Sequence, residues 1–374
     1  MALTKYKLGA LIELCDVRNY DGIYTLDDIR GISTGKEFIE TKANMDGVSL
    51  SSYKVVDCQE FAYVADTSRR GDKIAIAFNT GKKPVLISSI YTVFRVADKD
   101  RLLSDYLFMF FNRPEFDRYA RFNSWGSARE TFDWDTMCDI DIELPDLPTQ
   151  QKYVDIYKAM VANQQSYERG LEDLKLVCDA YIENISADEY KSIGLFIKRN
   201  QNRNQEKVFD KTQVKGFNNE GEFIKPMRLF SGDISTFKVI KKNDFVYNSR
   251  INSTIKKLSV ALNEGDDLIV SPAYESFYIC DTDKLDPYYL YMLLQREQFA
   301  KKVLFHSFGS STLVFGFDNL GEVEIPIPDI QIQRAIANIY RTYKERKAIN
   351  EKLKAQIKGI CPILIRGSLE EGKA

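Results

Sequence analysis

The chain has few side chains that could catalyse a reaction. Its 374 residues include one histidine, His306, so a histidine-dependent triad or a histidine-rich metal site is nearly excluded. Gly31–Lys36 resembles a phosphate-binding loop, but only three residues separate its glycines, and Glu37 stands where a serine or threonine would hold magnesium. No Gly-x-Gly-x-x-Gly follows an expected strand. The Asn-Pro-Pro-Tyr or Asp-Pro-Pro-Tyr motif that marks an amino-methyltransferase is also absent from the sequence. We therefore expect no active site in this chain.

The cysteines and the hydrophobic segments exclude further classes of protein. No two cysteines are close enough for a Cys-x-x-Cys pair, so we expect scattered, buried thiols in a reducing cytosol. The N-terminal segment meets Glu13 and Asp16 too early for a signal peptide, and no apolar run is long enough to span a membrane. With 44% hydrophobic and 28% charged residues, the composition is that of an ordinary globular protein. We expect a cytoplasmic protein with no membrane partner.

Charge is balanced overall but not locally. The net charge is −2, yet residues 195–258 hold 14 Lys and Arg against 6 Asp and Glu, and residues 135–189 hold 13 Asp and Glu against 4 Lys and Arg. A basic region is typical of a surface that meets the DNA phosphate backbone. A solvated protein surface is the alternative.

Loops in and near the basic region carry side chains that can read base edges. Lys198–Gln205 is rich in Arg, Asn and Gln, and Asn248–Thr254 has the same mixture directly after an expected strand. Arg binds guanine through two hydrogen bonds, and Asn and Gln bind adenine in the same way. In the first half of the chain, Thr67–Lys73 takes the position that corresponds to Asn248–Thr254. Ordinary polar loops are the alternative, but the recurrence favours contact with DNA.

The two halves of the sequence are copies of one unit. An offset of 183 residues places Leu144–Leu147 on Ile327–Ile330 and Gly126-Ser127 on Gly309-Ser310, with no gap from Leu102 to Ile185. Further upstream the offset becomes 184 and then returns to 183, as expected for small length changes in loops. The period is too long for a solenoid repeat, so we expect a duplicated domain.

Each copy has the same order of expected elements. Short strands come first, for example Lys73–Phe78 and Leu268–Val270, and a short helix follows, over Leu103–Tyr119 in one copy and Asp286–Leu304 in the other. A Gly-Ser loop, a strand that ends in proline and a long helix complete the copy. We expect an α+β fold in which two homologous α/β domains are separated by two long antiparallel coiled-coil helices with pseudo-twofold symmetry. The expected boundaries are 1–147 and 187–330 for the domains, 148–186 for the first helix and 331–374 for the second helix and tail.

Both long helices show a coiled-coil pattern, because apolar residues recur at alternating steps of four and three. The predicted seam consists of Met160, Gln164, Tyr167, Leu171, Leu174, Cys178, Tyr181 and Ile185 in one helix and Ile339, Tyr343, Arg346, Asn350, Leu353, Ile357, Ile360 and Leu364 in the other. Three polar residues, Gln164, Arg346 and Asn350, lie in mid-seam. They either reach solvent at a loose crossing or fix the register of the pair.

The duplicated order resembles the specificity (S) subunit of Type I restriction–modification systems, and the resemblance covers essentially the whole chain. The family's Pro-Pro-Leu-x-Glu-Gln signature is similar to Pro145–Gln150 and Pro328–Gln333. Asn243–Arg250, Ser271–Tyr274 and the Gly-Ser loops are also similar. The signature's second proline is Asp146 or Asp329 here, and its Glu is Thr149 or Ile332.

The resemblance implies a non-catalytic subunit that reads a bipartite target in double-stranded DNA with two target-recognition domains. It implies two methyltransferase (M) subunits and restriction/translocase (R) subunits as partners. No cofactor is expected in this chain, because S-adenosylmethionine would belong to M, and ATP with magnesium would belong to R. The alternatives are the specificity subunit of a Type II system with a fused nuclease–methyltransferase, and a coiled-coil interaction scaffold without a DNA role.

The candidate DNA-binding residues come from the basic loops and the Gly-Ser loops of both copies. They are Arg18, Arg69, Arg70, Lys73, Gly126, Ser127, Arg129, Lys198, Arg199, Asn202, Arg203, Asn248, Ser249, Arg250, Asn252, Gly309, Ser310 and Ser311.

Overall fold

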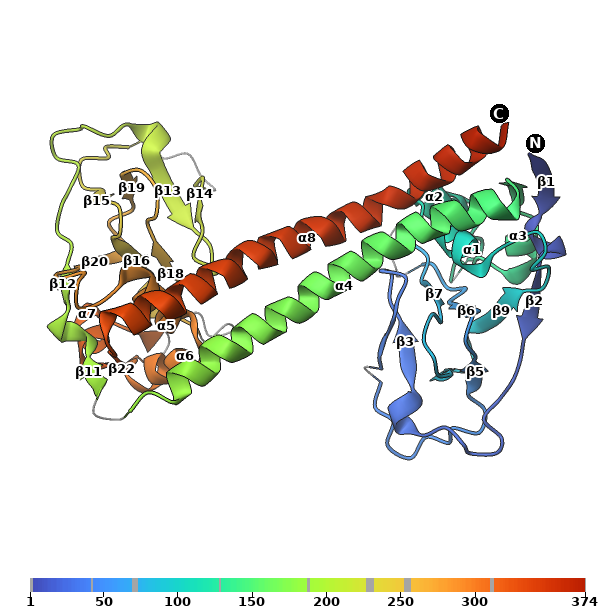
Figure 1. The fold of residues 1–374 in the computed structure, drawn as a ribbon, viewed down its shortest axis with the longest axis horizontal. Helices are drawn as coiled ribbons and strands as arrows, with labels where there is room; N and C mark the ends of the chain where they lie inside the picture. The colour runs from blue at the N-terminus through green and yellow to red at the C-terminus, as the bar shows by residue number, and fades with distance from the viewer. Residues whose placement is uncertain are drawn as a thin grey trace. The chain divides into compact units, whose positions relative to one another are not determined.

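The computed structural model describes residues 3–41, 43–68, 73–127, 129–186, 189–226, 232–251, 257–309 and 313–373. Contacts divide the chain into two compact units (Figure 1). Unit 1 comprises Met1–Tyr167 and Ile349–Ala374, and unit 2 comprises Glu168–Ala348. Both unit boundaries lie inside the long helices, so each unit includes a part of both. The four-part division expected from the sequence stays a prediction.

Unit 1 is built on a four-stranded antiparallel sheet with the order β2-β9-β6-β7 (Figure 1). Aromatic side chains of this sheet pack against a short helix. Phe61 of β6 stacks on Phe94 of β9 at 5.0 Å, and Phe111 of α1 meets Phe61 edge-on at 5.8 Å. The strands are β1 (Thr4–Lys7), β2 (Ile12–Cys15), β3 (Arg30–Ile32), β4 (Phe38–Glu40), β5 (Lys54–Val56), β6 (Glu60–Tyr63), β7 (Ile76–Phe78), β8 (Val85–Ile87), β9 (Thr92–Val96) and β10 (Asp141–Leu144). The helices are α1 (Ser104–Phe111), α2 (Pro114–Phe122) and α3 (Trp134–Cys138).

Unit 2 repeats this sheet with the order β12-β20-β16-β18, again antiparallel, and Phe245 stacks on Phe277 at 4.7 Å. A second sheet has the order β14-β13-β19-β15. The strands are β11 (Tyr190–Ser192), β12 (Ile197–Arg199), β13 (Val214–Phe217), β14 (Phe223–Ile224), β15 (Lys238–Ile240), β16 (Phe245–Tyr247), β17 (Arg250–Ile251), β18 (Val260–Leu262), β19 (Leu268–Val270), β20 (Glu275–Ile279), β21 (Leu313–Val314) and β22 (Glu324–Pro326). The helices are α5 (Pro287–Gln295), α6 (Glu297–Phe305) and α7 (Phe317–Glu322).

The single short helix expected over Leu103–Tyr119 and over Asp286–Leu304 is wrong, because two helices occupy each of these segments. In unit 1, α2 begins at Pro114, and a proline disfavours helical backbone in the residue before it; Arg113 accordingly has ψ 140°. In unit 2, Arg296 separates α5 from α6 with ψ 150°. Its guanidinium pairs with Asp179 of the long helix α4 (Leu147–Glu183) at 2.9 Å, a contact that no local pattern predicts.

A buried glutamine joins the first turn of α4 to the loop before α1. The Gln150 Oε1 accepts a hydrogen bond from the Leu103 N–H at 3.0 Å. Its Nε2 donates to the carbonyl oxygens of Arg101 and Pro145 at 2.7 and 2.9 Å. The side chain is fully buried. Both ends of the amide are therefore used to hold three backbone groups that no strand or helix satisfies.

Gln333 makes the same three contacts in the first turn of the second long helix, α8 (Ile330–Lys373). It accepts from the Asp286 N–H at 3.0 Å and donates to the carbonyl oxygens of Lys284 and Pro328 at 2.9 and 2.8 Å. It too is fully buried. The final glutamine of each signature-like segment is thus a structural brace.

Aspartates begin both long helices. The Asp146 carboxylate accepts from the Thr149 N–H at 3.0 Å, and the Asp329 carboxylate accepts from the Gln331 N–H at 2.8 Å. An aspartate at this position satisfies an N–H of the first turn that has no partner within the helix. The hydrogen bonds from Thr149 lower the pKa of Asp146. The departures Asp146 and Asp329 from the signature therefore act as helix caps.

The long helices pack together in each unit, as the coiled-coil pattern predicts. In unit 1, Val154 of α4 lies in one core with Cys361, Leu364 and Ile365 of α8. In unit 2, Ile182 of α4 lies in one core with Ile336 and Ala337 of α8. The predicted seam is wrong at the end of α4, where Tyr181 is 57% exposed and Ile182 is 5% exposed. There the helix also faces the core of unit 2, which moves the buried position by one residue.

Two of the mid-seam polar residues fix the register of the helix pair, and the third reaches solvent. Gln164 and Asn350 are buried within unit 1, and the Gln164 Nε2 donates to the Asn350 Oδ1 at 3.0 Å. Arg346 is exposed. A buried amide pair favours the one alignment in which both amides meet, so Gln164 and Asn350 fix the register, whereas Arg346 reaches solvent.

The buried glutamines predict that substitutions at Gln150 and Gln333 destabilise the protein more than substitutions at nearby exposed glutamines. We expect Gln150→Ala and Gln333→Ala each to lower the free energy of unfolding by about 2–4 kcal/mol, because buried backbone groups lose their partners. The matched controls are Gln151→Ala and Gln331→Ala, since both of these glutamines are exposed. Urea denaturation followed by circular dichroism gives the comparison. Equal effects at Gln150 and Gln151 would contradict the brace.

Candidate nucleic-acid interface

The central sheet of unit 1 has one end at which β2 and β6 finish and β7 and β9 begin. We call this the loop end of the sheet, and in unit 2 it is the end at which β12 and β16 finish and β18 and β20 begin. In unit 1 the candidates Arg18 and Lys73 lie there, since Arg18 follows β2 and Lys73 precedes β7. Lys73 is exposed.

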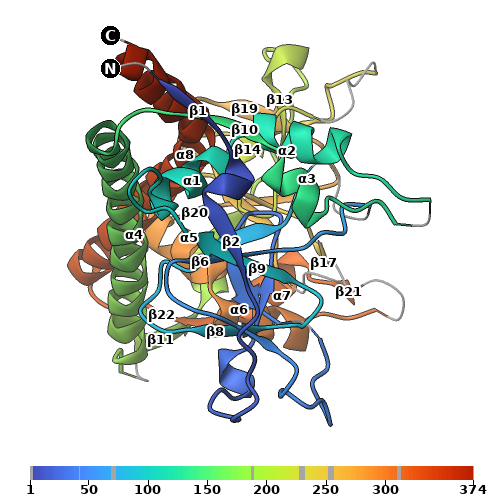
Figure 2. The same ribbon diagram turned by 90° about the vertical axis from the view of Figure 1, so that its right-hand side faces the viewer.

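The segment Trp125–Thr131, which we call the Gly126 hairpin, joins the loop end of unit 1. Trp125 and Thr131 exchange two backbone hydrogen bonds of 3.1 and 3.0 Å, and the Thr67 N–H donates to the Glu130 carbonyl oxygen at 2.9 Å. Figure 2 shows the segment between α2 and α3 extending away from the helices. The structure therefore brings the candidates Gly126, Ser127 and Arg129, all exposed, to the residues that follow β6.

The loop end of unit 2 gathers the second set of candidates. Asn248, Ser249 and Arg250 follow β16, and Arg250 is exposed. Arg199 ends β12, and its guanidinium lies over the Phe317 ring at 4.9 Å and 3.6 Å from the Glu275 carboxylate. Asn202 follows β12 and is exposed, whereas Lys198 lies within this edge strand, further from the loop end.

A matching hairpin joins this second loop end. The segment Phe308–Val314, which we call the Gly309 hairpin, is closed by backbone hydrogen bonds of 3.1 and 2.9 Å between its first and last residues. Val314 pairs with Arg250 through β17 and β21. Gly126 and Gly309 both have φ 143°, a conformation that disfavours side chains. The two glycines thus share the same φ angle.

The candidates Arg18 and Arg203 take matching positions, and both are held by the protein itself. The Arg18 Nη1 donates to the Ser52 carbonyl oxygen at 3.3 Å, and the Arg203 Nη1 donates to the Thr236 carbonyl oxygen at 3.0 Å. Arg18 also pairs with the Asp16 carboxylate at 3.0 Å. Part of each guanidinium is therefore already used in hydrogen bonds within the protein.

Two residues of Lys198–Gln205, the stretch predicted to read bases, have a structural role. Asn200 is buried and donates to the Asp244 carboxylate at 2.9 Å, and burial raises the pKa of Asp244. Asn204 is buried and bonds both backbone groups of Phe209, at 2.9 and 3.0 Å. In unit 1, Asn19 makes the same pair of bonds to Tyr24, at 2.9 and 3.1 Å. An offset of 185, which pairs Asn19 with Asn204 and Tyr24 with Phe209, is the signal that could have revealed this role.

Five of the candidates, Arg69, Arg70, Asn252, Ser310 and Ser311, lie outside the described residues. Their roles stay predictions, as do those of the described candidates.

Within the described residues, nothing points to catalysis. His306 is half-buried, with Nδ1 3.9 Å from the Glu322 carboxylate, and no three metal-ligating side chains gather in the part of the chain that the structure describes. Burial raises the pKa of the Cys15 and Cys361 thiols to about 12, which makes them unreactive at neutral pH. The expectation of buried thiols is wrong for Cys58, Cys138 and Cys280, which are half-buried or exposed. No described helix is both long and apolar enough to cross a membrane.

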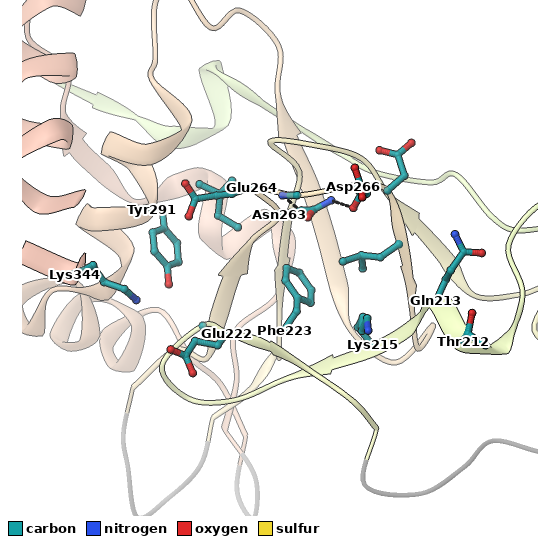
Figure 3. Close-up of a pocket in the computed structure, with 15 residues that line it drawn as sticks. Thr212, Gln213, Lys215, Glu222, Phe223, Asn263, Glu264, Asp266, Tyr291 and Lys344 are labelled. Atoms are coloured by element: carbon teal, nitrogen blue, oxygen red, sulfur yellow. Dashed lines mark hydrogen bonds between the residues drawn. The ribbon is translucent and has the colours of Figure 1, made fainter. Parts of the chain in front are cut away.

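A pocket of about 650 Å³ in unit 2 has the wrong charge to hold DNA (Figure 3). Its lining includes the carboxylates of Glu222, Glu264, Asp266 and Asp267. Carboxylates repel phosphate groups, so we do not assign this pocket to the interface. Asn263 closes the turn beside it through a 3.0 Å bond to the Asp266 carbonyl oxygen.

Residues 189–359 match the model of a family described as Type I restriction modification DNA specificity domain. No curated protein sequence shows significant similarity to the chain.

Solved structures of similar fold include the Type-I restriction-modification system S subunit from M. genitalium. It is 11% identical with a TM-score of 0.60, and the match covers 97% of this chain and 96% of that chain. The HsdS subunit from Thermoanaerobacter tengcongensis is 14% identical with a TM-score of 0.41, covering 100% and 97%. A third structure, whose description concerns complex assembly and conformational transition of the type I R-M system, is 13% identical with a TM-score of 0.47. That match covers 100% of this chain and 97% of the other. The first likeness shows a shared fold, and the other two scores are too low to add to it.

The Gly126 hairpin predicts a steric effect. A Cβ atom at Gly126 would lie 2.1 Å from the Arg129 carbonyl oxygen, so Gly126→Ala must open the hairpin. We expect the Thr67 and Thr131 amides to exchange with solvent about 30-fold faster, equivalent to about 2 kcal/mol of local stability. Hydrogen exchange measures this, with Gly31→Ala as the control because its nearest neighbour lies at 3.5 Å. Unchanged exchange in Gly126→Ala would contradict the hairpin geometry.

Proposed function

We propose that the chain is a specificity (S) subunit of a Type I restriction–modification system, whose DNA specificity domain residues 189–359 match, and that it reads a bipartite DNA target, one half with each unit. The matched loop ends carry the proposal. In each unit, exposed basic residues and a hairpin that contains the Gly-Ser motif lie at the loop end of the central sheet. Basic side chains neutralise phosphates, and the amide and guanidinium groups among them discriminate bases.

In this proposal the chain catalyses nothing itself. Methyl transfer, translocation and cleavage belong to methyltransferase and restriction subunits that this chain recruits, two of the methyltransferases being expected. S-adenosylmethionine and ATP with magnesium belong to those partners. A cytoplasmic location follows, because the DNA and the partners are there. A Type II specificity subunit would share the DNA role, whereas a coiled-coil scaffold would not.

Substitutions of a basic and a base-reading candidate test the DNA role. We expect Lys198→Ala to weaken all duplexes by a similar factor and to reduce the salt slope by about 0.9. We expect Arg250→Ala to relax one position of one half-site, at a cost of about 1–3 kcal/mol. The matched control is Lys284→Ala, a 70% exposed lysine that follows β20 at the opposite end of the sheet.

The measurement is mobility shift of the co-expressed methyltransferase complex on bipartite duplexes, combined with methylome sequencing of each variant. A complex that binds no duplex would refute the DNA role and favour the scaffold. An unchanged methylated motif in Arg250→Ala would refute the choice of Arg250 as a base reader.

The long helices give a second test of the bipartite target. Seven residues inserted after Gln164, matched by seven after Lys347, keep the heptad register and lengthen each helix by about 10 Å. We expect the target to keep both half-sites and to gain about three base pairs of unspecified spacer, with lower activity because the half-sites also rotate by roughly 100°. Insertion in one helix alone is the control, since it breaks the pairing of the seam. An active double variant with the original spacer would contradict the proposal that the helices set the distance.

A further inference from the structure

Each unit exposes two large aromatic side chains beside its hairpin. Phe122 and Trp125 of unit 1 are 78% and 69% exposed, and Phe305 and Phe308 of unit 2 are 82% and 69% exposed. Phe305 and Phe122 have the two highest exposed fractions among the large apolar residues that the structure describes. The offset of 183 pairs Phe122 with Phe305 and Trp125 with Phe308. Exposure of this kind at one position is ordinary, but its exact recurrence in both copies requires a reason.

The backbone holds both pairs in the same way. Phe122 and Phe305 end α2 and α6. A buried serine follows each helix. The Ser124 hydroxyl donates to the Ala120 carbonyl oxygen and the Ser307 hydroxyl donates to the Val303 carbonyl oxygen, both at 2.6 Å. Trp125 and Phe308, the residues after these serines, are the first residues of the two hairpins. These rings are therefore held outward by a folded support.

The rings stand among the basic groups of the loop ends. In unit 1, Arg129 lies in the same hairpin as Trp125 and is exposed. In unit 2, the Gly309 hairpin pairs directly with Arg250. Arginine and aromatic side chains are enriched both at protein–protein interfaces and at surfaces that bind nucleic acid. Lysine, in contrast, is depleted at protein–protein interfaces and contacts phosphates at DNA interfaces. The exposed Lys73 at the loop end of unit 1 therefore favours DNA over a partner protein as the occupant.

The two units differ where base edges would be read. In β2, Glu13 pairs with Arg95 and Leu14 pairs with Phe94. At an offset of 185 the corresponding residues of β12 are Lys198 and Arg199, so one unit has an acidic and an apolar group where the other has two cations. Different half-sites require such differences in hydrogen-bonding groups. Every base, however, has an aromatic face, so a contact by stacking can be the same in both units.

We propose that Phe122 with Trp125, and Phe305 with Phe308, contact the faces of DNA bases and partly unstack one base step in each half-site. The inference rests on the proposed DNA role and adds a contact that is independent of base identity. Apolar side chains that insert between base steps in this way bend the duplex and enlarge the contact with the protein.

The test uses the complex of the full chain with its methyltransferase and a duplex carrying the target found by methylome sequencing. We expect Trp125→Ala and Phe305→Ala each to weaken binding by about 5- to 150-fold, as measured for the loss of one stacked base. Trp125→Phe, which keeps a ring, should stay close to the unchanged protein. Leu195→Ala is the matched control, because Leu195 is 73% exposed but precedes β12 at the other end of the sheet.

A second readout reports the stacking itself. We expect 2-aminopurine at one step of each half-site to brighten when the complex binds, and this signal to disappear in Trp125→Ala or Phe305→Ala. Circular dichroism checks folding, and Trp125→Gln and Phe305→Gln replace any alanine variant that does not fold.

Alanine variants that bind DNA and increase the 2-aminopurine fluorescence like the unchanged protein would overturn the inference. If Arg250→Ala lost binding in the same experiment, the proposed DNA role would still stand. Alanine variants that no longer co-purify with the methyltransferase in the absence of DNA would also overturn it, because the rings would then be a protein contact. An unchanged complex that binds no DNA would remove the proposed function, and the inference with it.

Discussion

The position of the short helices in each unit depends on one buried amide. Gln150 and Gln333 each accept one hydrogen bond and donate two, and every partner is a backbone group outside regular structure. A glutamate could not donate, a leucine could do neither, and an asparagine is shorter by one methylene. The amide fixes the loop before α1 or α5 against the start of the long helix. The short helices that follow this loop lead directly to the hairpins. Gln150 and Gln333 therefore help to fix the position of the hairpins.

Most of the architecture could be predicted because the sequence contains two copies of the same unit. Offsets of 183 and 184 residues pair most of the strands, the Gly-Ser loops and the long helices of the two copies, and the expectation of a mixed helix and strand fold with paired long helices is confirmed. Details that depend on contacts distant in sequence were missed. The break at Arg296 is associated with Asp179 of α4, and the burial of Ile182 in place of Tyr181 follows from the core that α4 meets.

The candidate interface was predictable by region and not by residue. Asn202 is exposed, while Asn200 and Asn204, two positions to either side, are buried and bonded to the protein's own backbone. The same amide serves equally well to close a turn or to read a base, so composition alone cannot separate the two uses. Burial separates them, because an amide whose donors and acceptor are already satisfied has nothing left to offer a ligand.

The buried pair of Gln164 and Asn350 has a consequence for misfolding. A slide of one heptad between α4 and α8 would keep the seam apolar but would place Gln164 against Tyr343 or Ile357 in place of Asn350. An amide buried without its partner costs about 1–3 kcal/mol. Such a shifted form would then be populated about 5- to 150-fold less than the native alignment from this contact alone. The amide pair therefore disfavours a register-shifted form of the helix pair, which a seam of purely apolar residues would leave nearly as stable as the native state.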